Sequence, residues 1–271
     1  MKKFKTALIL LLLLVAVPAT FAQDDVVYKT APAFVRVVTN MMGYNFIAKK
    51  VAQGVLKKAL KNSAAGEYKV KIDSFSGVDL KKGMFRGLII DGKDLCVDDE
   101  LFISSIHFET TSDFNYVDYR SKPVVFMTDL PMSYNIVVTE EDLNKTFSSN
   151  KIIDVISAII PLMSIEKPKI KLEKEKIRVS SSLKFPFVKA VKFSMSAALK
   201  VENGKIILSD VESNSQKDFT RRLVNMINRQ CLFDDMDIYL FDNTNTSVSV
   251  TDVKIEDSKI FINGNLLVKK S

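Results

Sequence analysis

Histidine, cysteine and the short motifs of common enzymes are scarce in this sequence. Among 271 residues there is one histidine, His107, and there are two cysteines, Cys96 and Cys231. These three residues do not form a zinc-ligand set of the usual spacing. The sequence also has no G-x-S-x-G motif for a nucleophilic serine and no G-x-x-x-x-G-K-[ST] loop for phosphate. We therefore expect no metal, no cofactor and no enzymatic activity.

The remaining groups for acid–base catalysis are two acidic clusters, Asp98-Asp99-Glu100 and Asp234-Asp235. Each cluster falls in an expected turn between strands, where carboxylates are ordinarily solvated. The single histidine lies between Ile106 and Phe108 in an expected strand, and we interpret it as structural. The sequence therefore identifies no catalytic residue.

Glycine and proline are also few, with 9 and 7 residues. No Pro/Gly/Ser-rich linker, tight internal repeat or low-complexity tract divides the chain. A hydrophobic content of 47% is ordinary for a globular protein with a substantial core. We expect a single domain over residues 23–271, built in two parts, 23–163 and 164–271.

The first 22 residues have the pattern of a secretory signal peptide. A basic start, MKKFK, precedes an apolar stretch over residues 7–17, and the segment ends at Ala22. The stretch of about 11 apolar residues is shorter than the roughly 20 that span a bilayer, although an uncleaved anchor stays as an alternative. We expect export to the periplasm or another part of the cell envelope. Export would place Cys96 and Cys231 in an oxidising compartment, as one disulfide or as two buried thiols.

The excess of positive charge is modest. Removal of Lys2, Lys3 and Lys5 with the signal peptide lowers the formal net charge from +7 to about +4. No basic stretch is rich in aromatic residues that could stack on bases. We therefore expect no nucleic-acid partner.

Acidic residues are absent between Asp25 and Glu67, where residues 29–62 predict a long helix with a weak point at Met42-Gly43-Tyr44. At 100° per residue, one arc of this helix is apolar: Ile47, Ala48, Val51, Ala52, Val55, Leu56 and Ala59. The basic residues on the other arc either form a solvated face or meet anionic lipid headgroups. We take Val51 and Val55 as candidates for lining an apolar groove. The candidates for contacting headgroups or a membrane surface are Lys49, Lys50, Lys57 and Lys61.

A second long helix is expected over residues 139–163. Thr139 and Asp142 have the spacing of a capping box, and Pro161 ends the segment. Residues 151–160 are apolar on nearly every side, so this part of the helix must be covered by protein core, by a second chain or by lipid. The candidates for lining a lipid groove are Ile152, Ile156, Ile159 and Ile160.

Much of the rest alternates between apolar and polar residues, as strands do. The clearest strand covers residues 191–201, and Asn203-Gly204 predicts a tight turn after it. Asp91-Gly92 is interpreted as a second hairpin turn, Asn263-Gly264 also has turn residues, and residues 215–231 predict another capped helix. The expected fold class is α+β: a long, curved antiparallel sheet rolled around the N-terminal and central helices, leaving an elongated apolar groove.

Three segments resemble the LmeA-like phospholipid-binding proteins of the bacterial cell envelope. They are DSFSGVDLKKGMFRGLIIDGKDL at residues 73–95, IVVTEEDLN at 136–144 and VKIEDSKIFINGNLLV at 253–268. The resemblance implies an exported, non-catalytic protein that binds phospholipid, with a fold similar to the tubular lipid-binding type. The residues that match the T-E-x-D-L-N motif are interpreted as structural: Thr139, Glu140, Asp142, Leu143 and Asn144.

Two hypotheses follow from these patterns. The first is a monomeric protein that binds or shuttles phospholipid and meets an anionic membrane surface. The alternative is a structural or assembly protein of the envelope that packs on a partner chain through residues 151–160. The isoleucines of that segment also fit an ordinary core, which is the usual place for such a stripe.

Overall fold

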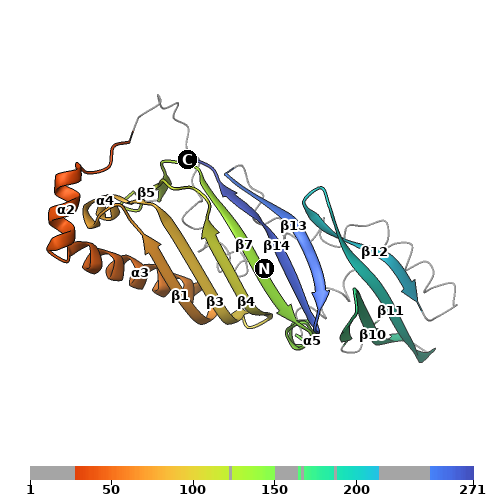
Figure 1. Cartoon of the computed structure of the whole chain (residues 1–271). Helices are drawn as coiled ribbons and strands as arrows, with labels where there is room; N and C mark the ends of the chain where they lie inside the picture. The colour runs from red at the N-terminus through yellow and green to blue at the C-terminus, as the bar shows by residue number, and fades with distance from the viewer. Residues whose placement is uncertain (1–27, 122–123, 150–163, 166–167, 186–187, 214–244) are drawn as a thin grey trace.

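A computed structural model describes residues 28–121, 124–149, 164–165, 168–185, 188–213 and 245–271. The fold class is α+β, as expected, and the sheets are antiparallel and not closed (Figure 1). The described part contains four helices: α2 (Ala33–Met41), α3 (Tyr44–Ser63), α4 (Gly77–Lys82) and α5 (Glu140–Phe147).

The first sheet takes strands from both ends of the described chain. Its order is β1 (Ala65–Asp73), β3 (Gly87–Val97), β4 (Leu101–Thr110), β7 (Leu130–Thr139), β14 (Lys259–Val268) and β13 (Thr246–Glu256). Because the C-terminal hairpin pairs with β7, the chain returns to its first sheet after building the second one.

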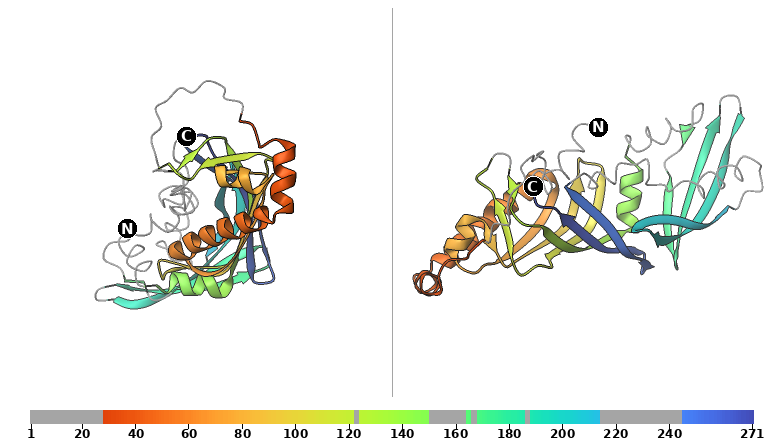
Figure 2. Two further views of the ribbon diagram at one scale, coloured as in Figure 1. Left: turned by 90° about the vertical axis from the view of Figure 1, so that its left-hand side faces the viewer. Right: turned by 90° about the horizontal axis from the view of Figure 1, so that it is seen from above.

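The second sheet has the order β12 (Lys205–Ser213), β11 (Val188–Glu202), β10 (Lys176–Phe185) and β8 (Ser164–Ile165). Strand β9 (Lys169–Glu173) pairs with β10 as well. A small third sheet joins β2 (Met84–Phe85), β5 (Asn115–Asp118) and β6 (Val125–Phe126). The second sheet and α2 lie at opposite ends of the molecule (Figures 1 and 2).

Strand alternation gives the first sheet one polar and one apolar face. A polar row crosses five strands by direct register: Lys69, Asp91, His107, Asn135 and Asn263. One residue adjacent to each of these forms an apolar row on the opposite face: Val70, Ile90, Phe108, Tyr134 and Gly264.

Helix α3 covers the β1 end of the apolar face. Leu60 of α3 is 4% exposed and forms a buried cluster with Tyr68, Val70, Ile90 and Leu95. Leu56, Ala52 and Ala48 of the same helix are partly buried against this cluster or a second one that contains Tyr134. The hydrophobic effect therefore fixes α3 against the sheet along a single line of side chains.

Two helix predictions need correction. The N-terminal helix breaks at its expected weak point, because Gly43 adopts a left-handed conformation with φ of 72° between α2 and α3. The capping box at Thr139 is confirmed, but α5 ends at Phe147 and not at Met163. Serine and asparagine follow directly, and their side chains compete with helical hydrogen bonds.

Several other predictions fall outside the described residues. The helix of residues 215–231 and the apolar segment 151–160 belong to this group, and so does Cys231.

The expected hairpin turn at Asp91-Gly92 is wrong, since both residues lie within β3 and pair with β4. The expected turn at Asn203-Gly204 is confirmed by positive φ at both residues and by the pairing of Glu202 with Lys205.

Candidate functional site

Helices α2 and α3 expose an unusual amount of large apolar side chain. We define the helical apolar stripe as eight residues with exposed fractions between 57% and 85%: Phe34, Val37, Met41, Met42, Phe46, Ile47, Val51 and Val55. Contiguous exposed apolar surface of this kind marks interaction sites more often than single exposed residues do. In the end-on view, both helices lie in front of the sheets (Figure 2, left).

The structure places the predicted groove residues Val51 and Val55 in this stripe. They are 61% and 67% exposed, so in this structure they lie on the outer surface of α3 and not in an interior groove. The apolar arc of α3 is wider than the sheet can cover. Ala48 and Ala52 occupy its inner half and face the core, whereas the larger valines lie on the outer half.

The four predicted headgroup lysines separate into two kinds. Lys49 Nζ lies 3.3 Å from Asp73 Oδ1, and its side chain is only 28% exposed. Lys50, Lys57 and Lys61 are exposed and form no ion pair with any described residue. At 100° per residue these three fall beside Ile47 on the outward side of α3. The exposed Lys58 adds a fourth positive charge there.

A buried carboxylate fixes the start of α2. Asp79 of α4 is 0% exposed, and its Oδ1 accepts a hydrogen bond of 2.6 Å from the backbone N–H of Ala31. The Ser76 hydroxyl donates to Asp79 Oδ2, also at 2.6 Å. The Asn45 side chain at the start of α3 accepts from Ser74 and donates to Asn40. These bonds hold α2, α3 and α4 as one unit.

A second apolar group lies on the first sheet, and its member Ile106 packs against the buried cluster that contains Leu60 of α3. The register aligns four half-buried side chains across four strands: Ile106, Ile136, Ile262 and Val253. We call these four residues the sheet apolar row. In the second sheet, Leu172, Ile177 and Ala197 align in the same way.

The two sheets are joined by backbone and side-chain hydrogen bonds. The Val250 N–H donates to the Gly204 carbonyl oxygen at 2.8 Å, which attaches the β11–β12 turn to β13. On α5, the Asn144 amide both donates to and accepts from the Ile170 backbone of β9 at 2.8 Å. Glu140 Oε2 accepts from the Leu172 N–H, also at 2.8 Å. Two residues of the T-E-x-D-L-N motif therefore hold β9 as a neighbouring strand would.

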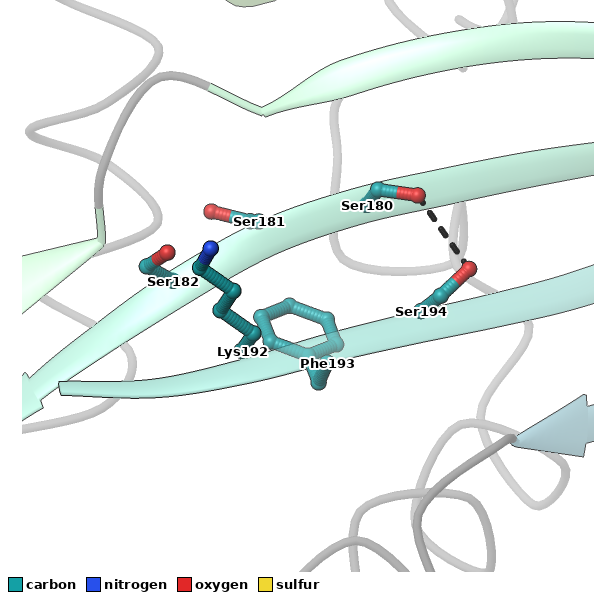
Figure 3. Close-up of a pocket in the computed structure, with 6 residues that line it drawn as sticks. All are labelled: Ser180, Ser181, Ser182, Lys192, Phe193 and Ser194. Atoms are coloured by element: carbon teal, nitrogen blue, oxygen red, sulfur yellow. Dashed lines mark hydrogen bonds between the residues drawn. The ribbon is translucent and has the colours of Figure 1, made fainter.

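A small polar pocket lies on β10 and β11 of the second sheet (Figure 3). It is lined by Ser180, Ser181, Ser182, Lys192, Phe193 and Ser194. The Ser180 hydroxyl donates to the Ser194 hydroxyl at 3.1 Å. Among the described residues that line this pocket there is no carboxylate or imidazole, and Lys192 supplies a positive charge.

Among the described residues considered for catalysis, His107 lies within β4 whereas Asp98, Asp99 and Glu100 lie between β3 and β4. His107 lies on the polar face of the first sheet, with its Nδ1 2.7 Å from Asp91 Oδ1. Asp98 and Asp99 form a turn with φ of 51° and 60°, and Asp234-Asp235 lies outside the described residues. Burial raises the pKa of the Cys96 thiol, which keeps it protonated. Within the described ranges, no group of His, Cys, Asp and Glu side chains is placed to hold a metal ion.

The capping residue Asp142 illustrates how the motif acts structurally. Its partial burial raises its pKa, but hydrogen bonds from Ser104 and Thr139 outweigh that effect, and the net shift is downward. The carboxylate therefore stays ionised while it caps α5. Thr139, Glu140, Asp142 and Asn144 all have such structural contacts.

Comparisons of the chain with protein-family models, with curated proteins and with solved structures give no match. The resemblance to the LmeA-like family therefore rests on the three sequence segments alone. No helix in the described part of the chain is long and apolar enough to cross a membrane.

Proposed function

We propose that this chain is an exported, non-catalytic protein of the bacterial envelope that binds or shuttles phospholipid. The observation that carries the proposal is the sheet apolar row, which presents half-buried aliphatic side chains across four adjacent strands. Aliphatic side chains aligned across four strands can contact the CH₂ groups of an acyl chain. Burial of each CH₂ group contributes about 0.8 kcal/mol, so two acyl chains are held firmly without polar contacts.

In the proposed arrangement, the antiparallel sheets curve and roll around α3 and the segment after α5, as in tubular lipid-binding folds. The acyl chains then lie along the apolar faces of the sheets. The isoleucines 152, 156, 159 and 160 lie outside the described residues and remain candidates for completing this surface. The resemblance to LmeA-like proteins supports the same function, and we expect the lipid carrier to be a monomer.

The test uses an acyl probe in solution, without membranes. Neighbouring residues of β7 point to opposite faces, so Ile136→Asn removes part of the sheet apolar row whereas Asn135→Gln changes only the polar face. A fluorescent fatty-acyl probe should bind the unchanged protein and be displaced by phospholipid. We expect Ile136→Asn to weaken probe binding about tenfold or more and Asn135→Gln to leave it unchanged.

Thermal unfolding of both variants checks that the fold is retained. Absence of probe binding to the unchanged protein would refute the proposal. A stable oligomer that takes up no probe would instead support the alternative hypothesis of a structural or assembly protein, and sedimentation in detergent-free buffer measures that state.

A further inference from the structure

We infer that α2 and α3 form a docking surface that lies flat in the interface of an anionic lipid bilayer. This inference deepens the proposed function and rests on it, since a lipid carrier must meet the membrane that supplies or receives its lipid. The observations that carry it are the exposed side chains of the helical apolar stripe and the neighbouring lysines, which form no ion pair with a described residue.

The first argument is the spacing of the stripe. On α2, Phe34, Val37 and Met41 recur at intervals of three and four residues. On α3, Ile47, Val51 and Val55 recur every four residues, on the side opposite the buried Leu60. Each helix therefore presents one apolar line to the outside. Residues at such positions enter the boundary between headgroups and acyl chains in interfacial helices.

The second argument is charge. Residues 28–66 contain no acidic residue. Lys50, Lys57, Lys58 and Lys61 are exposed on α3, and no described acidic side chain pairs with them. Lysines near an anionic lipid surface each strengthen binding by about fivefold. This one-sided charge complements phosphatidylglycerol or cardiolipin headgroups.

The arrangement of lysine and apolar groups also fits a bilayer. The Lys50 ammonium lies 4.6 Å from the centre of the Phe46 ring, so a positive charge lies next to an aromatic residue of the stripe. The flexible methionine side chains at positions 41 and 42 are 85% and 78% exposed. A fluid lipid phase accommodates such side chains without a preformed pocket.

The helices lie on the bilayer and do not cross it. α2 has 9 residues and α3 has 20, and no helix among the described residues could span a membrane. The bonds from Asp79 to Ala31 and from Ser74 to Asn45 fix both helices before binding. Because α2 lies at the end opposite the second sheet, docking there leaves the second sheet away from the bilayer (Figure 1).

The experiment measures binding of the exported chain to vesicles. Vesicles of phosphatidylglycerol and phosphatidylcholine, and of phosphatidylcholine alone, are sedimented with the protein at low salt. The triple variant Lys50→Gln/Lys57→Gln/Lys61→Gln should bind the anionic vesicles about 100-fold more weakly. The matched control is Lys69→Gln/Lys71→Gln/Lys93→Gln, which removes the same charge from exposed positions of β1 and β3 and should bind almost as the unchanged protein does.

Insertion is tested separately by fluorescence, because the chain contains no tryptophan. Val51→Trp should show a blue-shifted emission on anionic vesicles, whereas Lys69→Trp on the polar face of β1 should show none. Equal loss of binding in both lysine triples, or no blue shift for Val51→Trp, would overturn the docking inference. Retained uptake of the acyl probe in that case would leave the proposed lipid binding standing, so the two failures are distinguishable.

Discussion

Both sides of α3 carry aliphatic residues, but these residues have opposite environments. The inward side presents Ala48, Ala52 and Leu60 to the sheet, and the outward side presents Val51 and Val55 to solvent. Ala48 and Ala52 are partly covered whereas the larger Val51 and Val55 are exposed, which reverses the arrangement expected from hydrophobicity alone. The small residues of the inward side let α3 pack closely against the sheet. The outward side has another role, which we propose to be contact with lipid.

The largest predicted effect is a difference in unfolding free energy between substitutions on the inward and outward sides of α3. Leu60 is 4% exposed and packs in a buried cluster, so Leu60→Ala should lower the free energy of unfolding by about 2–5 kcal/mol. Val55→Ala on the outward side should change it by less than about 0.5 kcal/mol. Urea denaturation of both variants measures the contrast. Equal losses would show that Val55 is covered in solution.

The second prediction concerns the stability of the sheet at high pH, where Tyr134 ionises. Burial raises the pKa of Tyr134 to about 12, and its hydroxyl donates to the Ser249 carbonyl oxygen. The folded-state pKa is above the unfolded value near 10, so this contribution is complete below pH 10 and is lost as the pH rises toward 12. Stability should fall by about 1.4 kcal/mol per pH unit in that window.

The comparison for this titration is Tyr134→Phe, which has no group to ionise at that position. Its stability should fall less steeply between pH 10 and pH 12, as measured by denaturant unfolding at each pH. The same slope in both proteins would show that Tyr134 does not titrate differently on folding.

Enlarging the inward side should cost less than emptying it. Ala52→Leu adds volume where α3 meets the sheet core and should destabilise the protein by about 1–3 kcal/mol. Val51→Leu adds volume one residue away, on the outward side, and should be neutral within about 0.5 kcal/mol. Thermal unfolding of the pair checks the result, and a tolerated Ala52→Leu would show that the helix–sheet contact is loose.

The smallest stability effect should come from neighbouring lysines. Lys49→Gln removes a partly exposed ion pair with Asp73 and should cost about 0–1 kcal/mol, with little loss of vesicle binding. Lys50→Gln should leave stability unchanged but weaken binding to anionic vesicles about fivefold. The reverse pattern would contradict the assignment of Lys50, and not Lys49, to the docking surface.

The hairpins show how much of the fold could be predicted. The sequence pairs Asn203-Gly204 and Asp91-Gly92 both match a tight turn, but only the first makes one. A Cβ at Gly92 would lie 2.8 Å from Ile106 Cγ1, so this glycine permits a close cross-strand contact within the sheet. Since Ile106 lies on the next strand, the local sequence does not distinguish the two roles of glycine.

The sequence predicts the amphipathic character of α2 and α3, but it does not predict which side of α3 faces the sheet. Periodicity identified an amphipathic, acid-free helix, and the break near Gly43 was also expected. The side that meets the sheet depends on where small residues allow close approach, which the arc of apolar residues does not specify. The attachment of Glu140 and Asn144 to β9 was missed, because their partners Leu172 and Ile170 are distant in sequence.

We propose that the apolar faces of this protein hold phospholipid. The most direct measurement is lipid mass spectrometry on the protein purified from cells without detergent, combined with its mass by sedimentation. We predict a monomer that carries co-purified phospholipid. A lipid-free chain in a stable oligomer would contradict the account.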